Sequence, residues 1–139
     1  MIDVALITTW GQGCGTSEHA KNIVEYCTDP DIRISVHQTS FASYASMGQK
    51  ADIVHLNESG SANAGFQPEQ VTLLKSKGMK TLLTMNASSP ENNWNPYTRL
   101  FDQVAIFEPF TNDGYAYVPI GAPVFDVPDQ VETHRWVGT

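Results

Sequence analysis

The residues most able to bind a ligand stand together near the start of the chain, in the segment WGQGCGTS at positions 10–17. Its glycines, Gly11, Gly13 and Gly15, allow close approach of the backbone and positive φ angles. We expect a helix to begin at Ser17, with the unpaired N–H groups of its first turn facing the same space. The segment could therefore hold a phosphate or carboxylate group. The competing interpretation is a tight turn that merely requires glycine.

Three well-known motifs do not fit this segment. Counted from Gly11, the dinucleotide fingerprint Gly-x-Gly-x-x-Gly ends at Thr16, and counted from Gly13 it ends at Glu18. The predicted second strand also runs into VHQT, without the carboxylate that would bind ribose hydroxyls. Neither the Gly-Lys-Ser/Thr of nucleoside-triphosphate loops nor the Gly-x-Ser-x-Gly of hydrolases occurs.

Three histidines could take part in acid–base or metal chemistry. His19 falls in the first turn of the predicted helix, where it could contact a ligand or be a partly exposed helix residue. His55 lies within a predicted strand, which favours a hydrogen-bonded interior side chain, and His37 ends another strand. No pair has the spacing of metal ligands on one element, so we expect no metal site.

Two further groups suit the binding of sugars. Glu58 follows a predicted strand and could accept hydrogen bonds from hydroxyls or act as a base, unless it is a solvated loop residue. The segment 86–95 (NASSPENNWN) is rich in amides around Trp94, and it begins with Asn86. Amides can form hydrogen bonds with hydroxyls, and an indole can stack on a sugar face. Asn-rich loops are also common in proteins without such a role.

The elements that must position these residues alternate along the chain. Strands are expected where apolar, β-branched runs occur, and helices where apolar residues recur every three or four positions. The order predicts an α/β fold: a Rossmann-like parallel sheet with helices on both faces, in a single domain. The expected strands are 2–8, 32–36, 51–56, 80–85, 104–107 and 115–119, and the expected helices are 17–27, 41–48, 68–77 and 96–101.

Ligands of such sheets bind beyond the carboxyl ends of the strands, where the strand order reverses. Every candidate residue above falls in or beside a loop at those ends, apart from His55 within its strand. The loops at this edge are 9–17, 37–41, 57–66, 86–95 and 108–114.

The composition restricts the classes of function. A net charge of −7 over 139 residues, without a basic run, argues against binding to nucleic acid or an anionic membrane. No apolar stretch is long enough to span a membrane and no secretory signal is evident, so we expect a cytoplasmic protein. Cys14 and Cys27 match no zinc or redox spacing and are expected to be free thiols.

A family resemblance emerges from these segments taken in order. The stretch WGQGCGTSEHAKNIVEY at 10–26 resembles the opening of family-4 glycosyltransferases, where a strand leads into a CGI(A/S)-x-(Y/H) segment and a helix with NLxExL. ADIVHL at 51–56 is similar to the ADVVH strand of that family, and 80–85 to the strand that follows it. The resemblance covers roughly residues 1–120.

The resemblance implies the GT-B fold, in which two Rossmann-like domains face each other across a cleft. Residues 1–120 would be the amino-terminal, acceptor-side domain, and 121–139 an irregular segment where a missing donor domain would begin. The loop that approaches the donor diphosphate in that family maps onto Gly13, Cys14 and Gly15. Where many members have a histidine after the fourth strand, this chain has Asn86, which cannot act as a base.

The sequence thus predicts the acceptor-side half of a retaining, nucleotide-sugar-dependent glycosyltransferase for hexosyl transfer, inactive without a donor domain. Its partners would be a carbohydrate or glycosylated acceptor and a nucleotide sugar as substrate, with no resident cofactor. One alternative is a stand-alone module that binds a small anion or a protein and could form a homodimer. Another is a flavodoxin-like or nucleotide-binding enzyme.

Overall fold

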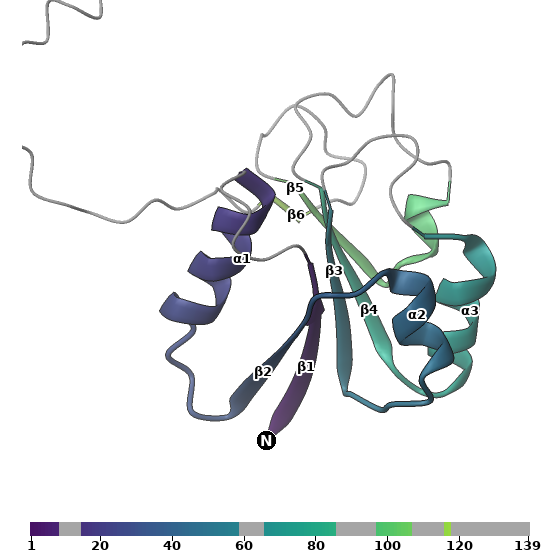
Figure 1. The fold of residues 1–139 in the computed structure, drawn as a ribbon, viewed down its shortest axis with the longest axis horizontal. Helices are drawn as coiled ribbons and strands as arrows, with labels where there is room; N and C mark the ends of the chain where they lie inside the picture. The colour runs from purple at the N-terminus through teal and green to yellow at the C-terminus, as the bar shows by residue number, and fades with distance from the viewer. Residues whose placement is uncertain (9–14, 59–65, 86–96, 107–115, 118–139) are drawn as a thin grey trace, which may run out of the picture.

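Six parallel strands form one sheet in the part of the chain that the structure describes (Figure 1). The structure is a computed structural model, and it describes residues 1–8, 15–58, 66–85, 97–106 and 116–117. The strands lie in the order β2-β1-β3-β4-β5-β6. Their bounds are β1 Ile2–Ile7, β2 Ile32–His37, β3 Ile53–Glu58, β4 Lys80–Met85, β5 Gln103–Ile106 and β6 Ala116–Tyr117.

Helices cover both faces of this sheet, which confirms the predicted α/β architecture (Figure 1). The first helix, α1, lies against one face, while α2 and α3 lie side by side against the other. This arrangement follows from right-handed crossovers between parallel strands: the crossover from β1 to β2 moves one way along the sheet, and the later crossovers move the other way. The helices are α1 Gly15–Tyr26, α2 Phe41–Ser46 and α3 Pro68–Ser76, with a 3-10 turn, η1, at Thr98–Leu100.

The predicted elements correspond to the observed ones, although many of their ends differ by one or two residues, and two of these differences concern the predicted site. The first helix begins at Gly15, so the prediction of Ser17 as its N-cap is wrong, and Ser17 is a fully buried residue inside the helix. The third strand extends through Asn57 and Glu58, which had been assigned to a loop. These polar residues stay in the strand because they pair with Thr84 and Met85 of β4.

Helix α3 shows how closely local signals set the boundaries. Pro68 occupies its first turn, where the missing N–H costs no hydrogen bond, and Gln67 caps it in a reciprocal pair with Gln70. Gly78 follows the helix with a φ of +87°, the left-handed conformation that glycine adopts without strain. Both ends are as the sequence predicts.

The hydrophobic core lies on the face that α2 and α3 cover. Alternate residues of the central strands point to this face because successive side chains of a strand lie on opposite sides. An aromatic trio of Phe41, Phe66 and Phe101 closes it, with ring centroids 5.0 to 6.4 Å apart. The strand residues of the core are Ala5, Ile7, Val54, Leu56, Leu83, Met85, Val104 and Ile106.

The strand order reverses between β1 and β3. The chain leaves β1 toward β2 at the edge of the sheet, then returns across β1 to β3. The first five strands have the flavodoxin-like order 2-1-3-4-5. The dinucleotide-binding arrangement is 3-2-1-4-5-6. If its third strand is left out and the others are renumbered, the same order results. In both arrangements the carboxyl ends of β1 and its neighbour on the return side flank the ligand crevice.

Asp102 joins the beginnings of β4 and β5. Its Oδ2 accepts hydrogen bonds from the backbone N–H and the hydroxyl of Thr81, at 2.8 and 3.1 Å, and Lys75 lies 3.6 Å from Oδ1. Burial opposes ionisation of this carboxyl. The two Thr81 hydrogen bonds, with Lys75 and Lys80 nearby, outweigh that effect and hold the pKa of Asp102 below its ordinary value.

Replacing Asp102 with alanine should therefore lower the free energy of unfolding by about 1–2 kcal/mol at pH 7. Because the folded-state pKa is lowered, the contribution is complete above the unfolded pKa of about 3.9 and is lost as the pH falls through the folded value. Urea denaturation at pH 7 and near pH 3 measures this difference. The exposed Glu25→Ala variant is the control, and an equal loss in both variants would contradict the assignment.

Candidate functional site

The ligand crevice predicted from topology lies where β1 and β3 end at the carboxyl edge of the sheet (Figure 1). The glycine-rich segment connects β1 to α1 here, but positions 9–14 are outside the described residues. What the structure describes on either side is the end of β1 with Thr8, and α1 from Gly15 onward. The first turn of α1 therefore begins beside the carboxyl end of β1.

Most of the buried polar residues gather between α1 and this edge of the sheet. We call them the α1 polar cluster. Its strand residues lie on the face of the sheet that α1 covers. His55 is directly opposite Leu6 in the pairing of β1 with β3, so the two side chains point to the same face. The cluster consists of Thr8, Ser17, His19, His55, Asn57 and Thr84.

Asn57 is the anchor of this cluster. Its side chain is 2 % exposed. The amide Nδ2 donates to the hydroxyl of Thr8 at 3.1 Å and to the backbone carbonyl of Thr16 at 2.8 Å. One amide group thus connects the end of β1, the end of β3 and the first turn of α1. The position at which α1 begins is fixed by a buried hydrogen bond rather than by apolar contact alone.

His55 and His19 form the inner part of the cluster. They are 6 % and 5 % exposed, and the Nε2 atom of His55 shares a hydrogen bond with the hydroxyl of Thr84. Burial, and to a lesser extent the positive charge that His19 can carry, lowers the pKa of His55 to about 3. His55 is therefore a neutral residue at physiological pH, bonded within the domain, and it is not placed to exchange protons with a bound substrate.

The structure bears on the predicted site residues as follows. His55 is the hydrogen-bonded interior side chain that was predicted. His19 is buried against the sheet, so its interpretation as a partly exposed helix residue is wrong. Glu58 ends β3 as a half-buried strand residue rather than a loop residue. Gly15 is the first residue of α1.

Gly13, Cys14, Asn86 and Trp94 lie outside the described residues, and their roles stay predictions.

Sequence reasoning missed Thr8, Asn57 and Thr84 as members of the cluster. Asn57 had a signal that could have been used, because it stands two residues after His55 and therefore on the same face of the strand. Thr8 and Thr84 carried no such signal. Their place depends on the strand pairing, which brings β1 and β4 to either side of β3.

Two further findings concern the described part of the chain. No group of three or more His, Cys, Asp or Glu side chains there is placed to hold a metal ion. None of the described helices is long and apolar enough to cross a membrane. The polar groups at this edge are the backbone N–H groups at the start of α1 and the carboxylate of Glu58 at the end of β3.

Comparison with known proteins adds no assignment to this geometry. No family model matches the chain, and no curated protein or solved structure matches it significantly.

The buried His55 predicts a particular dependence of stability on pH. Unfolding releases His55 to its ordinary pKa of 6.5, so between pH 6.5 and about 3 the unfolded chain binds a proton that the folded chain does not. The free energy of unfolding should therefore fall on acidification, by up to about 1.4 kcal/mol per pH unit from this residue. Urea midpoints measured from pH 7 to 4.5 should vary less steeply in His55→Gln. Equal slopes in the two proteins would contradict the prediction.

The Asn57 anchor predicts a contrast between two substitutions. Asn57→Ala should lower the free energy of unfolding by about 1–3 kcal/mol, because the Thr16 carbonyl and the Thr8 hydroxyl each lose a hydrogen bond from the buried amide. Asn57→Asp should lower it further at pH 7, since a carboxylate would then face that carbonyl oxygen, and acidification should restore part of the loss. Urea denaturation measures both, with the exposed Gln38→Ala variant as control. Wild-type stability in Asn57→Asp would show that the amide is not the donor.

Proposed function

We propose that this domain is the acceptor-side half of a nucleotide-sugar-dependent glycosyltransferase. The proposal rests first on the resemblance of the segments 10–26, 51–56 and 80–85 to family-4 glycosyltransferases. The observation that carries it further is the placement of the first of these segments. It leads from β1 into α1 at the edge where the strand order reverses, and Asn57 anchors the start of that helix there.

Different residues of this edge would contact the two substrates, the donor and the acceptor. Gly13, Cys14 and Gly15 would approach the diphosphate of the donor, with the first-turn N–H groups of α1 contributing positive potential. Glu58, at the end of β3, would accept hydrogen bonds from hydroxyls of the acceptor, together with Asn86 and Trp94. His19 is buried in the α1 polar cluster, so it would support the start of the helix rather than touch the sugar.

Catalysis would require a second domain. A glycosyl transfer develops negative charge on the departing diphosphate, and groups that converge on it from both sides of a cleft stabilise that charge. The donor and the acceptor must also be held in line for reaction. This domain alone would supply the contacts from one side of the cleft only. We therefore expect the isolated chain to bind nucleotide sugars weakly and to transfer no hexose.

The strand order is also compatible with one alternative function. The arrangement 2-1-3-4-5 is that of flavodoxin-like proteins, whose flavin binds at the crevice between β1 and β3. Purification of the chain distinguishes this alternative from the proposal, because a bound flavin would colour the protein yellow. The remaining alternative is a stand-alone module for a small anion or a protein. It predicts saturable binding of an anion without any preference for a nucleotide sugar.

The proposal predicts a weak, localised response to nucleotide sugars. In NMR titrations with UDP-glucose and GDP-mannose, the backbone amides of the first turn of α1 and of Glu58 should shift, with a dissociation constant in the range of roughly 0.1–10 mM. Gly13→Val should remove the response without unfolding the domain, because a side chain at this position would block the approach of the phosphate.

The exposed Ala42→Val variant in α2 adds a comparable side chain on the opposite face of the sheet from α1 and should respond like the wild type. Sub-micromolar affinity, or hexose transfer by the purified chain, would refute a dependence on a second domain. An unchanged titration in Gly13→Val would refute the role of the glycine segment.

A further inference from the structure

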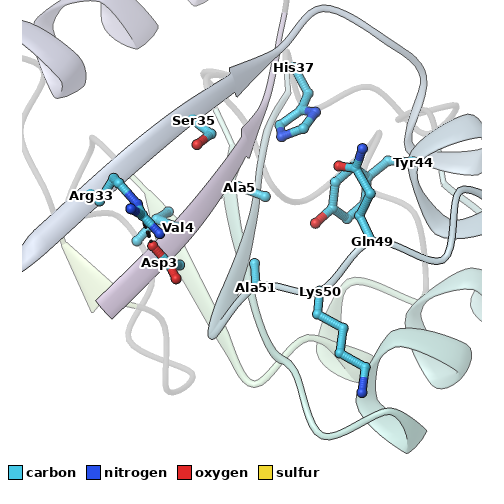
Figure 2. Close-up of a pocket in the computed structure, with 10 residues that line it drawn as sticks. All are labelled: Asp3, Val4, Ala5, Arg33, Ser35, His37, Tyr44, Gln49, Lys50 and Ala51. Carbon is cyan, nitrogen blue, oxygen red and sulfur yellow. Dashed lines mark hydrogen bonds and ion pairs between the residues drawn. The ribbon is translucent and has the colours of Figure 1, made fainter. Parts of the chain in front are cut away.

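A second concave surface lies on the opposite face of the sheet from the α1 polar cluster. It is a pocket of about 260 Å³ over β1 and the edge strand β2, bounded by α2 and by the segment 49–51 that leads into β3 (Figure 2). The pocket exists because α2 has only six residues and packs toward α3, which leaves the outer part of this face uncovered. The polar or charged residues that line it are Asp3, Arg33, Ser35, His37, Tyr44, Gln49 and Lys50.

Tyr44 is the unusual member of this pocket. The residue is 1 % exposed, and its ring packs edge-on against His37, with the ring centroids 5.0 Å apart. Figure 2 shows the ring extending from α2 with its hydroxyl directed into the pocket, toward the strands. Among the described residues this hydroxyl has no hydrogen-bond partner. Buried hydroxyls in native proteins are nearly always paired, so an unpaired one that faces a cavity indicates a missing partner.

The surrounding polar side chains, apart from that of Asp3, can each donate a hydrogen bond. Arg33 uses its Nε to bind the carboxylate of Asp3 at 2.7 Å, which neutralises the acidic group of the pocket and leaves the terminal guanidinium nitrogens for a ligand. The hydroxyl of Ser35 and the amide of Gln49 are likewise unpaired in the described part of the chain. Burial raises the pKa of Tyr44, so its hydroxyl keeps its proton and remains a donor over the physiological range.

From this geometry we infer that the pocket binds a small phosphate monoester of about the size of a sugar phosphate. Its phosphate oxygens accept hydrogen bonds from the Tyr44 hydroxyl and from the free nitrogens of Arg33. Ser35 and Gln49 supply the remaining polar contacts. A phosphate suits this site because its oxygens need several donors at once, and a guanidinium provides two in a fixed fork. The volume is at the small end for ligand pockets, which suits a sugar phosphate better than a whole nucleotide sugar.

The inference is independent of the proposed function. The pocket uses the face covered by α2, whereas the glycosyltransferase proposal uses the start of α1 and the ends of β1 and β3. Either site can be present without the other, and the two respond to different variants.

NMR titration with glucose 6-phosphate tests the proposed binding, with glucose and inorganic phosphate as matched probes. Glucose 6-phosphate should shift the backbone amides of Ser35, His37 and Tyr44 saturably, with a dissociation constant below roughly 1 mM. A response to inorganic phosphate alone also supports the assignment, since the phosphate group carries the recognition. No saturable shift at millimolar concentrations, or an equal response to glucose, would overturn it.

Tyr44→Phe is the decisive variant, because it removes only the hydroxyl. The affinity for glucose 6-phosphate should fall by about tenfold or more. The free energy of unfolding should stay the same or rise, since the hydroxyl has no partner to lose in the free protein. Tyr26→Phe, at an exposed tyrosine at the end of α1, is the matched control and should bind like the wild type. Unchanged binding in Tyr44→Phe, or a loss of stability in that variant, would refute the proposal.

Arg33→Gln provides a second, independent variant. Its exposed side chain can be replaced without disturbing the core, and the loss of the guanidinium should weaken the binding of both phosphate probes. If Arg33→Gln binds glucose 6-phosphate as tightly as the wild type, the anion is not held by this group and the assignment fails. In Tyr44→Phe the response of α1 to nucleotide sugars should be unchanged, which separates this test from that of the proposed function.

Discussion

The arrangement of this domain depends on how helix α1 is held against the sheet. On the other face, α2 and α3 pack through an apolar core closed by aromatic rings, and such packing tolerates small shifts. On the α1 face the contact is polar near the carboxyl edge. The side-chain amide of Asn57 bridges Thr8 and the Thr16 carbonyl, and a hydrogen bond ties His55 to Thr84. Hydrogen bonds have strict geometry, so they fix where the helix begins.

The two faces of the sheet therefore bury different kinds of residue. The apolar face supplies most of the burial that stabilises the fold. The other face can therefore carry polar residues whose desolvation costs free energy unless each is paired. Those residues lie where the strand order reverses, which is the edge at which parallel sheets bind ligands.

The two proposed sites share strand β1, but a different feature of the fold gives rise to each of them. The crevice beside α1 follows from the topology, since the crossovers from β1 leave its carboxyl end open. The pocket near Tyr44 follows from the length of α2, which is too short to cover the face of the edge strand β2. The alternating exposure of β2 reflects the same gap, because Arg33 and Ser35 point toward solvent on this side. A longer second helix would have closed it.

The sequence alone determined the strands, the helices and the class of fold. Apolar β-branched runs, Pro68 and Gly78 act locally, and their effects can be inferred without knowing what they touch. The membership of the α1 polar cluster and the lining of the Tyr44 pocket were decided by tertiary structure. Asn57 resembled a loop residue until its pairing with Thr84 placed it in β3, and Tyr44 was one residue of the predicted helix 41–48. The physical reason is that burial and hydrogen bonding depend on residues distant in sequence, and only strand order and helix packing bring those together.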